Sequence, residues 1–130
     1  MGLAPFNVLP SNAFLYNLGV EGSGYALLLH FCYGTFWVFV LVYTFDDDLS
    51  IIKAEVLAIV LWFFMMLVYS PLIGWGFLGY GYAHYLSVDH PLYFGNQLGT
   101  YIFITLLVHL VYGWALGCLN SRWLGTDYAK

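Results

Sequence analysis

Two histidines in apolar surroundings are the residues whose type and spacing could bind a cofactor. The stretch LLLHFCYG at Leu27–Gly34 and the stretch LLVHLVYG at Leu106–Gly113 align without gaps as Leu-Leu-x-His-x-x-Tyr-Gly. A neutral imidazole, from His30 or His109, is a ligand type for the iron of haem or the magnesium of chlorophyll. The alternative is a histidine that hydrogen-bonds to a neighbouring helix or to the tyrosine of its own stretch.

The same two stretches predict a helix-packing face. In a helix, His and Gly four positions apart share one side, with Tyr beside them. The spacing Gly113-x-x-x-Gly117 is typical of close helix contacts in membranes. We expect this face to dock a helix of a partner protein, with the histidines fixing the register, and we assign to it His30, Tyr33, Gly34, His109, Tyr112, Gly113 and Gly117.

Paired His-x-x-Tyr-Gly helices in a small membrane protein resemble the YagU-like group of uncharacterised inner-membrane proteins. The resemblance covers Leu27–Gly34 and Leu106–Gly117. It implies an architecture of paired membrane helices and carries no agreed activity.

A second candidate site is a metal site in the segment AHYLSVDHP. It offers His84, Asp89 and His90, which are ligand types for zinc or copper. The spacing His-x4-Asp-His matches no strong metal motif. Asp89 is also typical of a turn that precedes His90 and Pro91, so the structural interpretation stays open beside the metal site.

The composition indicates that a membrane is the solvent of these elements. Of 130 residues, 62% are hydrophobic and 8% are charged, whereas a soluble domain has about a quarter charged. Three Lys or Arg residues in all exclude a surface that neutralises several phosphates of a nucleic acid. The chain is therefore expected to be an all-α integral membrane protein.

Three apolar stretches are long enough to cross a bilayer, which takes roughly 20 residues in a helix. We expect one membrane domain over residues 1–130, with transmembrane helices at 24–45, 56–78 and 99–119, each free of Asp, Glu, Lys and Arg. Residues 1–23 are expected to form an interfacial segment whose short helix is capped by Ser11 or Asn12 and ends near Gly19.

Three further features qualify these spans. Pro71 and the glycines that follow it predict a kink or an unwound helix end, in a region that shapes a cleft for lipid, quinone or pigment. His30 lies about six residues into its span and His109 about ten, which disfavours a haem sandwiched between them. An interfacial aromatic belt is expected to contain Trp75, Tyr80, Tyr82, Tyr85 and Trp123.

The cations set the expected orientation, because cytoplasmic loops are enriched in Lys and Arg. With three spans, Lys53, Arg122 and Lys130 all fall on one side of the membrane. We therefore expect the N-terminus outside and the C-terminus in the cytoplasm, in a cell's inner membrane.

The function that fits these features best is a small, non-catalytic accessory subunit of a larger membrane complex, of electron-transfer or oxidase type. The expected spans hold no carboxylate, and no Ser, Cys or Lys has a recognisable base beside it. Its partners would be other membrane subunits and bound lipids, with no cofactor required. The alternatives are a haem- or chlorophyll-binding protein that uses His30 or His109, and a homo-oligomeric small transporter or channel.

Overall fold

The computed structural model describes residues 10–21, 23–46, 50–81, 87, 89–90, 93 and 98–123. These residues form helices and turns and contain no strand, so the all-α prediction is confirmed. The elements in chain order are α1 (Pro10–Asn17), α2 (Ser23–Phe45), α3 (Ile51–Phe64), the π-helical turn η1 (Met65–Tyr69), α4 (Ser70–Leu72), the 3-10 turn η2 (Phe77–Gly79) and α5 (Leu98–Trp123).

In the part of the chain that the structure describes, three helical segments are long and apolar enough to cross a membrane, namely Gly24–Phe45, Ile51–Leu72 and Leu98–Arg122. At a rise of about 1.5 Å per residue, each of them covers a hydrocarbon core of about 30 Å. The prediction of an all-α membrane protein with three spanning helices is confirmed.

The second spanning helix lies closer to the N-terminus than the expected range 56–78. Ser50 caps it, because its side chain accepts a hydrogen bond from the amide of Lys53 at 3.3 Å. The helix therefore starts at Ile51 and contains both Lys53 and Glu55. The expectation that every span is free of charged residues is wrong for this helix. The ammonium of Lys53 lies 5.1 Å from the ring centroid of Phe45, a cation–π distance.

A π-helical turn and a proline end the same helix. Pro71 has no amide hydrogen, and in a regular α-helix its ring would collide with the carbonyl four residues earlier. The backbone widens just before it, since the amide of Ser70 donates to the carbonyl of Met65, five residues back. After Leu72 the chain leaves the helix, and Gly74 takes a φ of 88°. Of the two expected alternatives, a kink or an unwound end, the structure has the helix end, just after Pro71 at Leu72.

The short helix α1 has a glycine cap. Gly19 has a φ of 76°, and the amide of Val20 donates to the carbonyl of Leu15 at 2.9 Å, as in a left-handed C-terminal cap. Ser11 does not cap this helix, because the helix already begins at Pro10 and Ser11 is buried inside it. Proline suits the first position, where its missing amide leaves no bond unmade.

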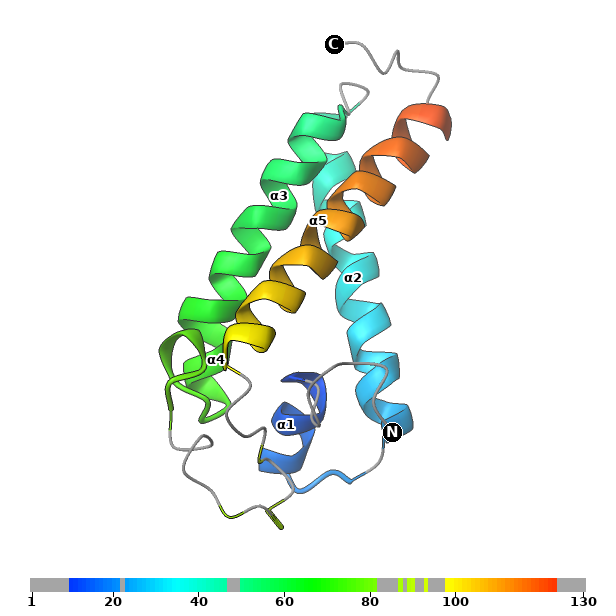
Figure 1. The fold of residues 1–130 in the computed structure, drawn as a ribbon. Coiled ribbons are helices and arrows are strands. Elements are labelled where there is room, and N and C mark those ends of the chain that lie inside the picture. The colour runs from blue at the N-terminus through cyan, green and yellow to red at the C-terminus, as the bar shows by residue number, and fades with distance from the viewer. Residues whose placement is uncertain are drawn as a thin grey trace.

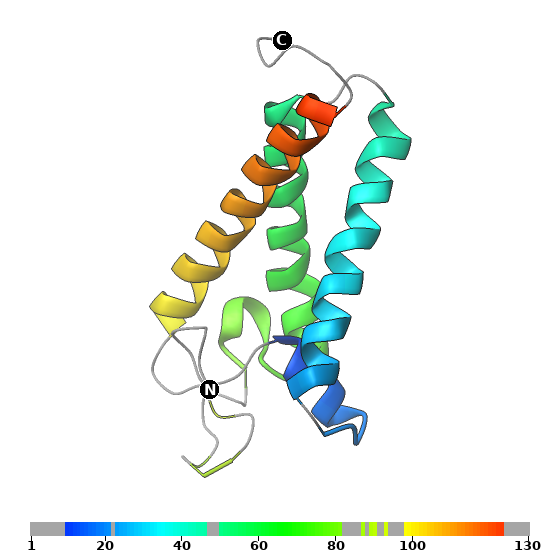
Figure 2. The same cartoon turned by 90° about the vertical axis from the view of Figure 1, so that its right-hand side faces the viewer.

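The helix directions are plain in two views. α3 and α5 run antiparallel and pack along their lengths, while α2 stands beside them and runs parallel to α5 (Figures 1 and 2). α1 and the segment after α4 lie at the end where α5 begins (Figure 1). In the most apolar stretch of α2, 11% of residues are buried, compared with 28% in the second span and 22% in the third. α2 is therefore the least packed of the three.

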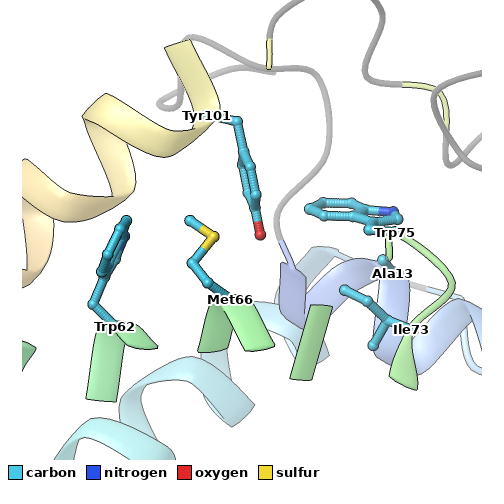
Figure 3. Close-up of a cluster of buried hydrophobic side chains, with 6 residues drawn as sticks. All are labelled: Ala13, Trp62, Met66, Ile73, Trp75 and Tyr101. Carbon is cyan, nitrogen blue, oxygen red and sulfur yellow. The ribbon is translucent and has the colours of Figure 1, made fainter. Parts of the chain in front are cut away.

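A cluster of buried side chains joins α1, the end of the second span and the start of α5 (Figure 3). Its members are Ala13, Trp62, Met66, Ile73, Trp75 and Tyr101. The rings of Trp75 and Tyr101 meet edge to face, with 5.4 Å between their centroids, which is a favoured geometry for aromatic pairs.

This cluster corrects the expected aromatic belt. Trp75 is fully buried, because the chain turns back toward α5 after α4. Tyr80 is exposed, as a belt residue would be. Tyr82, Tyr85 and the side chain of Trp123 lie outside the described part of the chain.

Candidate functional site

Two glycines of the expected packing face, Gly113 and Gly117, meet α3 of the same chain. A β-carbon added at Gly113 would stand 2.8 Å from the β-carbon of Ala58, and one added at Gly117 would stand 2.7 Å from the Cα of Ile51. Only residues without side chains allow two helices to approach so closely. The part of the expected docking surface at Gly113 and Gly117 is therefore covered by α3.

Tyr112 connects the two histidine stretches, Leu27–Gly34 and Leu106–Gly113. Its hydroxyl donates to the carbonyl oxygen of Gly34 at 2.8 Å. Further along the same faces, Leu41 of α2 and Leu116 of α5 belong to one buried cluster. The repeated stretches therefore face each other across the contact between α2 and α5.

His109 is held by its own helix. Its Nδ1 lies 2.7 Å from the carbonyl oxygen of Thr105, one turn earlier, and its side chain is half-buried. A carbonyl oxygen only accepts hydrogen bonds, so Nδ1 carries the proton in the neutral ring and Nε2 keeps a free lone pair. The Thr105 hydroxyl accepts a hydrogen bond from Trp62 Nε1 at 3.1 Å and donates to the carbonyl of Tyr101 at 2.6 Å. The backbone that orients His109 is thereby fixed to α3.

His30 is exposed, and among the described residues no hydrogen bond to its ring is found. It shares one face of α2 with Leu27, Gly34 and Leu41, which are three, four and eleven positions away. Because Gly34 and Leu41 contact α5, His30 points to the α5 side of α2.

Tyr33, the counterpart of Tyr112 in the repeat, is not brought into the contact between the helices. It is exposed, and its ring meets the ring of Trp37 edge to face at 6.0 Å between centroids. The equivalent positions of the repeat thus have different neighbours, since Tyr112 reaches across to α2 while Tyr33 meets a ring of its own helix.

The second candidate site falls partly outside the described residues, because His84 is among those left out. Asp89 is exposed. His90 is half-buried, with its ring 6.2 Å from the ring of Tyr16 between centroids. In the part of the chain that the structure describes, no three His, Cys, Asp or Glu side chains gather as a metal site would require.

The segment after Pro71, where the sequence predicts a cleft, packs against α1 and against itself. Ile73 is buried, and its carbonyl accepts a hydrogen bond from Asn17 Nδ2 of α1 at 2.9 Å. Gly76 and Gly81 touch through their backbones, since a β-carbon at Gly76 would stand 2.5 Å from the Cα of Gly81. This segment therefore closes the core beside α1.

Some of these features have a sequence signal and others have none. The Gly113-x-x-x-Gly117 spacing marks a close contact, but any surface of small residues can occupy it. Thr105 and Trp62 matter because their side chains meet between α3 and α5. Neither belongs to the repeat, so sequence reasoning missed them.

Comparisons of the chain with protein-family models, with curated proteins and with solved structures find no match. The resemblance of the two histidine stretches to the YagU-like group stays a prediction.

Proposed function

We propose that this chain is a small, non-catalytic subunit of a larger membrane protein complex, held there by the side of α2 that faces away from α3 and α5. We call this side the outer face of α2. It consists of Tyr25, Leu28, Cys32, Phe36, Phe39 and Tyr43, which recur at helical spacing and are all exposed.

The observation that carries the proposal is how little of α2 the rest of the chain covers. Tyr43 is 92% exposed and Phe39 is 70% exposed. Thr35 and Tyr33 on the flanks of this face are also exposed, and the described residues offer their hydroxyls no hydrogen bond. Hydroxyl groups within a span gain most from a bond to another helix, because lipid tails provide no partner.

The type of complex, its membrane and the orientation of the chain are proposed from the sequence patterns. The complex would be of electron-transfer or oxidase type, in a cell's inner membrane, with lipids around the remaining faces. α3 begins and α5 ends at the same end of the bundle (Figure 1). Lys53 and Arg122 stand at that end, so it would be the cytoplasmic one and the N-terminus would lie outside.

Photo-crosslinking in the native membrane tests this proposal. A photoreactive residue at Phe39 should give a discrete crosslink to another protein, and the tagged chain should co-purify with that protein in mild detergent. The matched control is Val60, which is 56% exposed on α3 and should crosslink to lipid alone. A chain that crosslinks only to lipid from Phe39 and purifies as a lone monomer contradicts the proposal.

The same preparation tests the type of complex. An electron-transfer or oxidase complex absorbs visible light through haem, flavin or iron–sulfur groups. A colourless complex would overturn that part alone. Ion flux in liposomes that contain only this chain would instead favour a homo-oligomeric channel or transporter.

A further inference from the structure

We draw no further inference here: the strongest candidate, the side of α2 that carries the exposed residues Leu27 and His30 beyond the hydrogen bond between Tyr112 and Gly34, is an apolar helix face, and nothing in the structure shows what covers it.

Discussion

Replacement of Gly113 by alanine tests the contact between α3 and α5, on which the rest of the bundle rests. The new methyl group would stand 2.8 Å from the β-carbon of Ala58 and 3.0 Å from the carbonyl oxygen of Ala54. Neither neighbour can turn aside, because one is a backbone atom and the other is a methyl group fixed to the backbone. The two helices must therefore move apart.

The magnitude follows from two opposing effects. Alanine is favoured over glycine in a helix by about 1 kcal/mol, and overpacking of a well-filled contact costs about 1–3 kcal/mol. We expect Gly113→Ala to lower the free energy of unfolding by up to about 2 kcal/mol, since the rigid neighbours place it at the upper end. A loss of 1–2 kcal/mol changes the ratio of folded to unfolded chains roughly 5- to 30-fold.

Reversible unfolding in mixed detergent micelles, followed by circular dichroism, measures this change. Gly99→Ala on the same helix is the control, because a β-carbon there has no atom within 4 Å. It should leave the stability unchanged or raise it by up to about 1 kcal/mol. If Gly113→Ala is as stable as the native chain or more so, the close approach of α3 and α5 is refuted.

Three further substitutions give distinct expectations under the same assay. Tyr112→Phe removes the bond to Gly34 and should cost about 0.6 kcal/mol, as membrane hydrogen bonds do on average; no loss would mean that this bond does not hold α2. Trp62→Phe leaves the Thr105 hydroxyl without its donor and should cost about 1 kcal/mol, so a neutral effect would contradict the tie between α3 and α5. Gly76 has a φ of 71°, and the methyl group of Gly76→Ala would stand against the backbone of Gly81. This substitution should therefore cost more than the roughly 1–2 kcal/mol of a left-handed alanine in open space. A smaller loss would contradict the packed turn.

The three-helix membrane fold could be predicted because apolar length is a property of the sequence alone. The bounds of the second helix could not, since Lys53 and Glu55 suggested a later start. The structure shows that Ser50 caps the helix before them. A cap of about 1 kcal/mol is a local effect that a hydrophobicity pattern does not register.

The candidate site could be predicted in its residue types but not in its neighbours. Gly113 and Gly117 signal a close contact, yet Ala54 and Ala58 of the same chain are as suitable as any foreign helix. Tyr33 and Tyr112 have identical places in the repeat, and only Tyr112 reaches the other stretch. Which one does so depends on how α2 and α5 are rotated about their axes, and the repeat does not encode that rotation.

A density map of the particle that contains this chain in its native membrane tests the central claim most directly. Our account predicts three membrane crossings, with density from another protein along Phe36, Phe39 and Tyr43 of α2. A chain surrounded only by lipid at these residues, or one with a different number of crossings, would contradict it.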